Sequence, residues 1–194
     1  MIPDFKRKLQ GAVDLLFLFP RGVEPFSGER RLAIKTLIIV QLVLFPLIPI
    51  TAAMVPPVGF ESLDYAGQLK NILAHDVITL VLTLALNWQI AGLLEKRHRF
   101  WLALEVGAWL NMVFVVTVMI PLLLAQHFDL VPEATMMRVF IALTIYGFVV
   151  SGCMMHTVYR VSLPIIIGWM AANFCLDRET WNLLLLIQGM PLLK

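Results

Sequence analysis

Residues 72–94 read ILAHDVITLVLTLALNWQIAGLL, an apolar stretch in which Asp76 is the only acidic or basic side chain apart from His75. A helix needs roughly 20 apolar residues to cross the roughly 30 Å hydrocarbon core of a bilayer, and this stretch is long enough. It therefore predicts a transmembrane helix.

Four more stretches come close to the same length and apolar character. Together with 72–94 they predict an all-α fold, a polytopic membrane helix bundle with five transmembrane helices. The composition agrees, because 60% of the residues are hydrophobic and 14% are charged, whereas soluble domains have about 45–50% and about 25%. The four further stretches are 37–55, 101–125, 136–155 and 161–176.

The two ends of the chain are expected to lie at membrane surfaces. Apolar residues recur with helical spacing in 5–19, which predicts an amphipathic helix on the cytoplasmic face that stops at Pro20. The apolar piece 181–193 is too short to span and is expected to be interfacial or re-entrant. The predicted division is 1–35 cytoplasmic, 36–178 transmembrane and 179–194 C-terminal.

The basic residues orient the bundle. Eleven of the fifteen Lys and Arg lie before the first predicted span, between spans two and three, or at Arg160 between spans four and five. The positive-inside rule then places the N-terminus in the cytoplasm and, with five spans, the C-terminus outside, as in a bacterial inner membrane protein. The net charge of +2 argues against a nucleic-acid partner. The four remaining basic residues are Lys70, Arg138, Arg178 and Lys194.

Polar residues of the second span share one helix face: Asp76, Thr79, Thr83 and Asn87. One interpretation is an ion or proton path with Asp76 as its outer carboxylate. The other, which we favour, is structural: the threonines bond their own helix and Asp76 stabilises the helix N-terminus.

A second set of polar residues lies near the cytoplasmic side. Glu105 is one turn inside the third span, and Arg160 lies at a matching depth after the fourth, so we predict a buried ion pair that His156 joins. In the alternative, Arg160 reaches the lipid headgroups and Glu105 pairs with Arg97 or Arg99.

Small residues spaced four apart predict faces for close helix contact. They are Ala103 with Gly107, Gly147 with Ser151, and Gly168 with Ala172.

No catalytic motif is evident, so the chain is not expected to be an enzyme, and no metal or cofactor is expected. Haem is the cofactor alternative, since His98 and His156 are predicted inside and His75 and His127 outside. Cys153 and Cys175 are predicted to stay free thiols, because they lie near opposite membrane faces.

The layout, together with Tyr159-Arg160-Val161-Ser162-Leu163-Pro164, resembles the Yip1-like membrane protein family, whose signature is Tyr-Gly-Tyr-Ser-Leu. Arg160 replaces the glycine, and the family's acidic-Leu-x-Gly-Pro motif has no counterpart. The resemblance implies a non-enzymatic adaptor. Binding of small GTPases, which eukaryotic members achieve through a long cytosolic region, is not carried over to a segment of about 35 residues.

The predicted function is that of an accessory or scaffolding subunit in a larger membrane assembly. Its expected partners are membrane lipids and other integral membrane subunits or a second copy of the chain. The alternatives are a small transporter or channel that uses the polar face of the second span, and a haem-binding membrane subunit.

Overall fold

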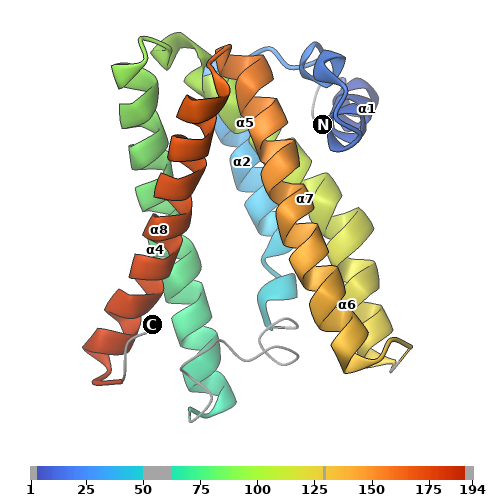
Figure 1. The fold of residues 1–194 in the computed structure, drawn as a ribbon, viewed down its shortest axis with the longest axis vertical. Helices are drawn as coiled ribbons and strands as arrows, with labels where there is room; N and C mark the ends of the chain where they lie inside the picture. Colours follow the sequence, from blue (N-terminus) through green and yellow to red (C-terminus); the bar gives the residue numbers. More distant parts are fainter. Residues whose placement is uncertain (1–3, 50–62, 129, 191–194) are drawn as a thin grey trace.

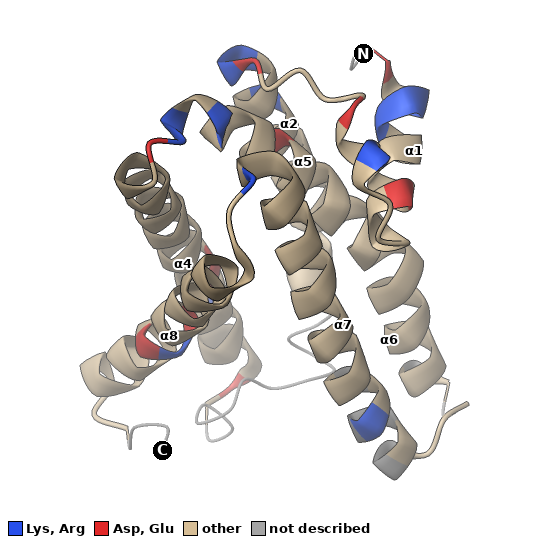
Figure 2. Ribbon diagram, turned by 45° about the horizontal axis from the view of Figure 1, so that its top comes forward, with Lys and Arg blue, Asp and Glu red and all other residues tan. Residues whose placement is uncertain are grey.

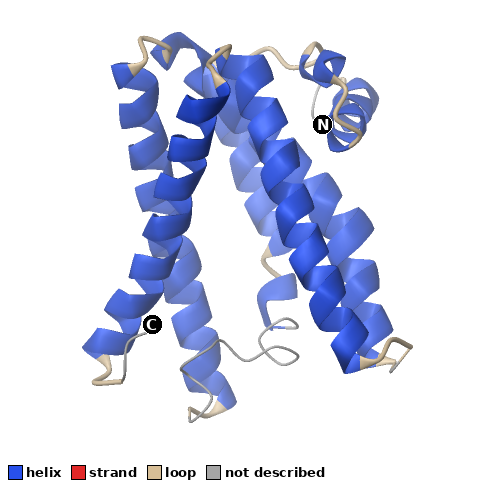
Figure 3. Cartoon of the chain, in the orientation of Figure 1, coloured by secondary structure: helices blue, strands red, loops and turns tan. Residues whose placement is uncertain are grey.

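The computed structural model describes residues 4–49, 63–128 and 130–190, and every regular element in these ranges is a helix (Figure 3). The all-α class is therefore confirmed for the described part of the chain. The elements are α1 (Phe5–Leu16), η1 (Pro20–Val23), α2 (Arg30–Leu44), α4 (Tyr65–Leu93), η2 (Arg97–Arg99), α5 (Phe100–Phe114), the π-helical turn η3 (Val115–Met119), α6 (Ile120–His127), α7 (Glu133–Tyr159) and α8 (Leu163–Ile187).

Three helical stretches in the described residues are long and apolar enough to cross a membrane: Tyr65–Leu93, Arg97–Gln126 and Ile141–Tyr159. They agree with the predicted second, third and fourth spans and are compatible with an integral membrane location. Helix α8 has 25 residues, but it includes the charged run 177–179.

The predicted first span, 37–55, is interrupted. Helix α2 ends at Leu44, because Pro46 has no N–H to donate to the carbonyl of Leu42. Residues 50–55 of this span lie outside the described residues.

The domain boundaries predicted at 35/36 and 178/179 both fall inside helices. Helix α2 begins at Arg30, and α8 continues past Asp177 to Ile187 before Gly189 takes a φ of 67°. The second boundary was placed at the charged run, but charges do not end a helix, and the sequence has no Pro or Gly from 169 to 188. The interfacial or re-entrant position of 179–194 stays a prediction.

The helices form two groups that meet at one end (Figure 1). Helices α4 and α8 pair with each other, while α2, α5, α6 and α7 form the second group. The groups join where η2 links α4 to α5 and where α7 turns into α8, and they diverge toward the opposite end.

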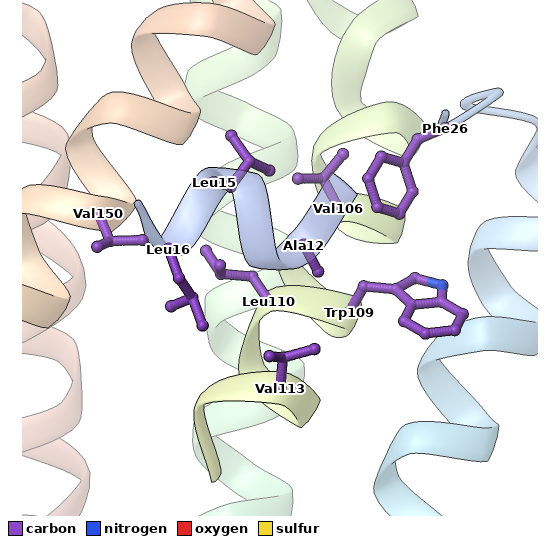
Figure 4. Close-up of a cluster of buried hydrophobic side chains, with 9 residues drawn as sticks. All are labelled: Ala12, Leu15, Leu16, Phe26, Val106, Trp109, Leu110, Val113 and Val150. Carbon is purple, nitrogen blue, oxygen red and sulfur yellow. The ribbon is translucent and has the colours of Figure 1, made fainter. Parts of the chain in front are cut away.

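Helix α1 lies beside the second group at the level of the joined end, against α5 and α7 (Figure 1). Its buried residues Ala12, Leu15 and Leu16 pack on one face of α5 (Figure 4). The complete cluster is Ala12, Leu15, Leu16, Phe26, Val106, Trp109, Leu110, Val113 and Val150. Each buried Leu contributes about 1.5–3 kcal/mol, so this packing holds α1 on the bundle.

Part of α1 and the turn after it remains exposed and apolar. Phe5, Leu9, Phe17, Leu18 and Phe19 all have exposed side chains. The predicted contact of this segment with a membrane surface stays a prediction, now for the face that α5 does not cover.

The turn between α7 and α8 is packed around aromatic rings. Tyr159 and Trp169 are buried, with ring centroids 4.7 Å apart, and Val158 and Ile166 pack beside them. This core fixes the start of α8 and places Trp169 toward the space between the two helix groups.

Lys and Arg residues gather at the joined end, around α1, η2 and the α7–α8 turn (Figure 2). The residues counted as cytoplasmic from the sequence thus share one end of the fold. Which side of a membrane this end faces stays a prediction.

Candidate functional site

A buried ion pair joins α1 to α5. Lys8 Nζ lies 2.5 Å from Glu105 Oε1, and the two side chains are 3% and 0% exposed. The second oxygen, Oε2, accepts hydrogen bonds from the backbone N–H of Gly28 at 3.0 Å and from Ser27 Oγ at 3.5 Å. The carboxylate therefore has partners on both oxygens, which offsets the cost of burying it.

The predicted pairing of Glu105 with Arg160 is wrong, and so is the alternative with Arg97 or Arg99. Arg160 is exposed and follows α7 with a left-handed φ of 53°, while His156 Nδ1 lies 2.9 Å from the carbonyl of Val161. Arg99 donates to the carbonyl of Val158 at 2.7 Å. The prediction that Glu105 is buried in an ion pair is confirmed, but its partner comes from the packed face of the amphipathic helix α1.

The polar face of α4 is divided between different contacts. Asn87 Oδ1 accepts from Trp169 Nε1 at 2.5 Å and from Asn173 Nδ2 at 3.1 Å, both on α8. Thr79 Oγ1 lies 3.3 Å from Nε2 of His75. Thr83 and Asn87 line a cavity between the helix groups.

Asp76 has a different position from the rest of this face. Its side chain is 50% exposed, with Oδ1 3.6 Å from His75 Nδ1, and it does not line the cavity. The interpretation of Asp76 as a helix N-terminal carboxylate is wrong, because α4 begins at Tyr65. Asp64 caps it instead, accepting a hydrogen bond from Gly67 N at 2.9 Å.

His75 and Asp177 connect α4 to α8 farther from the joined end. His75 is buried and stacked on Trp181 with ring centroids 3.8 Å apart, and its Nε2 lies 3.3 Å from Asp177 Oδ1. Beyond them, Gln188 Nε2 donates to Asn71 Oδ1. The α4–α8 contact thus carries a row of polar pairs along much of its length.

Sequence reasoning missed the α8 half of this row. Trp169, Asn173 and Asp177 are spaced four residues apart, which places them on one helix face. This spacing was the signal from which the polar face of α8 could have been predicted. Because the predicted fifth span ended at residue 176, Asp177 was not grouped with the other two residues.

The cavity lies between α2, α4, α5, α7 and α8 and has a volume of about 470 Å³. Its walls are largely apolar, with contributions from Leu80, Leu104, Phe148 and Met154. Asn173 Oδ1, which belongs to a lining residue, is buried without a hydrogen-bond partner. The polar lining residues are Gln41, Thr83, Asn87, Asn111, Ser151, Tyr159, Trp169, Asn173 and Asp177.

Within the described part of the chain, the glycines of the three predicted pairs do not bring helices into close contact, whereas Ala103 packs against the cluster around Tyr159 and Trp169. A Cβ added at Gly107, Gly147 or Gly168 would meet no atom within 4 Å. Gly107 lies with Ala103 and Ser151 in the cavity wall, and Gly107, Gly147 and Ser151 line a smaller cavity of about 170 Å³. Ala172, the partner of Gly168 in the predicted pair, is half-buried.

The close backbone approach is instead between α1 and η1. A Cβ on Gly11 would lie 2.6 Å from the carbonyl oxygen of Gly22.

The histidines occupy separate environments. His98 and His156 are exposed near the joined end, and His75 is held between Trp181 and Asp177. The side chain of His127 lies outside the described residues. Within the described part, no three His, Cys, Asp or Glu side chains come together as a metal site, and Cys153 and Cys175 are free.

The chain matches no family model, no curated protein and no solved structure. The likeness to the Yip1-like family stays a prediction.

Proposed function

We propose that this chain is a non-enzymatic integral membrane protein that serves as an accessory or scaffolding subunit of a larger membrane assembly. In this proposal five helices cross a bacterial inner membrane, with the N-terminus in the cytoplasm and the C-terminus outside. The gathering of basic residues at the end that carries α1 supports this orientation (Figure 2).

The observation that carries the proposal is an uncovered face of small residues on α8. Pro164, Gly168, Ala171 and Cys175 follow the spacing i, i+4, i+7, i+11, and all four are exposed. A Cβ at Gly168 would meet no neighbouring atom. Helices in membranes associate through small residues that let backbones approach, so this face suits a helix of another subunit or a second copy.

The experiment is purification in mild detergent and in lipid nanodiscs, followed by mass measurement of the intact particle. Oxidative cross-linking through the exposed thiol of Cys175 would then identify the neighbour on this face. We expect the wild-type chain in a complex and Gly168→Leu to release it, because the larger side chain holds the helices apart.

Ala85→Leu is the matched control, since Ala85 is a small exposed residue of α4 away from this face. It should leave the complex intact. A strictly monomeric wild-type chain, with no co-purifying protein in either medium, would contradict the proposal.

A small transporter or channel is the second candidate. It is favoured by the position of Thr83 and Asn87 of α4, together with Asn173 and Asp177 of α8, in the lining of the cavity. Asp177 replaces Asp76 as the carboxylate of such a path, since Asp76 does not line the cavity. Reconstitution into vesicles, with flux compared between wild type and Asp177→Asn, tests this candidate: equal flux at equal protein density would remove it.

A further inference from the structure

We infer that the cavity between α2, α4, α5, α7 and α8 binds one uncharged single-chain amphiphile, a molecule with an acyl or alkyl tail and a hydroxyl or amide head group. The inference is independent of the proposed accessory role, since it concerns the interior of a single chain.

The size and walls of the cavity fit such a molecule. Its volume of about 470 Å³ lies within the roughly 300–1,000 Å³ of known small-molecule sites. Leu80, Leu104, Phe148, Met154 and Phe174 provide apolar contact from four different helices. An alkyl tail fits these walls because it makes dispersion contacts with them and needs no polar partner.

The head group is indicated by the polar side chains of the cavity wall, among them Thr83, Asn111 and Ser151. Asn173 is already occupied, because its Nδ2 donates to Asn87 Oδ1 and to the carbonyl of Trp169 and its Oδ1 is buried away from the cavity. Hydroxyl and amide groups in an apolar wall favour a bound molecule with a hydroxyl or amide that can hydrogen-bond to them.

The charges of the lining exclude an anionic head group. Among the described residues, no Lys, Arg or His lines the cavity, so a carboxylate or phosphate would have no counter-ion in this lining. Asp177 is the only acidic residue of the described lining, and its Oδ1 is already 3.3 Å from His75 Nε2. An uncharged head group is what these residues accommodate.

The absence of a side chain at Gly107 keeps the space open. A Cβ there would meet no atom within 4 Å, so larger residues can enter the cavity without moving the backbone. Substitutions at Gly107 therefore change the free volume in steps: Gly107→Ala removes little and Gly107→Leu removes much.

The test is fluorescence quenching of the protein in phosphatidylcholine nanodiscs by a monoacylglycerol with a 9,10-dibromostearoyl chain. Trp169 forms part of the cavity wall, and a bromine atom that contacts its indole quenches the emission. We expect saturable quenching in the wild type and in Gly107→Ala. The saturable part should be lost in Trp169→Phe, which assigns the signal, and in Gly107→Leu. In Thr83→Val, which removes a hydroxyl from the cavity wall at nearly constant volume, we expect about a tenfold higher Kd, as for the loss of one buried hydrogen bond.

Several results would overturn the inference. One is quenching that rises linearly with the probe and is equal in Gly107→Leu, since this is ordinary contact with bilayer lipid. Another is equal saturable quenching by free dibromostearate or by a dibrominated phosphatidylcholine, which contradicts an uncharged single-chain ligand. Should Gly107→Leu fail to fold, Ser151→Leu fills the cavity from α7 instead of α5, and unchanged binding in that variant is equally decisive.

Discussion

Helix α1 meets α5 through an apolar cluster with one fully buried ion pair, whereas α4 meets α8 through a row of polar contacts interspersed with apolar ones. In the first region the apolar cluster around Trp109 accompanies the pair of Lys8 and Glu105. In the second, Leu184 and Leu185 form one buried cluster, Ala91 joins Ile166 and Trp169 in another, and the polar contacts are distributed along both helices. The stability of the first contact therefore depends strongly on a single pair of charges, and the stability of the second depends on many weaker interactions.

The largest effect is expected from removing one charge of the pair. Lys8→Met leaves the carboxylate of Glu105 buried without its cation, which should weaken the docking of α1 by about 3–5 kcal/mol. Hydrogen exchange of the α1 amides and protease cleavage near residue 20 measure the release of this helix. Lys8→Met combined with Glu105→Leu should restore most of the protection, and a double variant as weak as the single one would contradict this account. Arg21→Ala, which breaks a partly exposed ion pair with Asp14, should change little.

Leu15→Ala tests the apolar part of the same contact. Leu15 lies on the packed face of α1 and is 1% exposed. Its truncation should therefore cost about 2–5 kcal/mol of α1 docking through lost burial and a cavity. The same exchange measurement applies, and Phe17→Ala, at a position that is 68% exposed, is the matched control. Equal loss of protection in both variants would show that α1 is not held by this face.

Asn87→Ala is expected to have a smaller effect on the α4–α8 contact. It removes the acceptor of Trp169 and Asn173, and interhelical hydrogen bonds in membrane proteins contribute about 0.6–1.7 kcal/mol. Denaturant unfolding in detergent measures the loss, and a shift of the Trp169 emission reports its freed indole N–H. A loss of stability as large as that in Lys8→Met would contradict the view that many weak interactions hold α4 to α8.

The smallest effect is expected from His75→Phe. The phenyl ring can keep the stack on Trp181, and the contact with Asp177 disappears, so the change in stability should be about 1 kcal/mol or less. His75→Ala, which also removes the stack, should destabilise more in the same unfolding measurement. If both variants lose the same stability, the stacking of the ring has no role.

The sequence predicted the features that depend on local pattern. Continuous apolar stretches gave the helices at 72–94 and 101–125, and the spacing of Ala12 and Leu16 is that of a helix with one buried face. The predictions that required a partner were less successful. Glu105 pairs with a residue 97 positions away, and depth in the membrane alone did not select Lys8 over Arg160.

The remaining differences have specific causes. The charged run at 177–179 looked like the end of a span, although no helix-breaking residue accompanies it and α8 continues. The small residues Gly107 and Gly147 looked like contact points, but both line a small cavity between α1, α5 and α7, and a Cβ at either would touch no neighbouring atom. Spacing along one helix does not report the angle at which its neighbour crosses.

The pairing of Lys8 with Glu105 has a consequence for the order of events during synthesis. The two residues are 97 positions apart, so at about 5–20 residues per second the ribosome makes Glu105 some 5–20 seconds after Lys8. During that interval α1 has no protein surface on which to bury Leu15 and Leu16. An amphipathic helix of this kind can bind the headgroup layer of the membrane during that time. Helix α1 then packs onto the bundle only after α5 has been inserted.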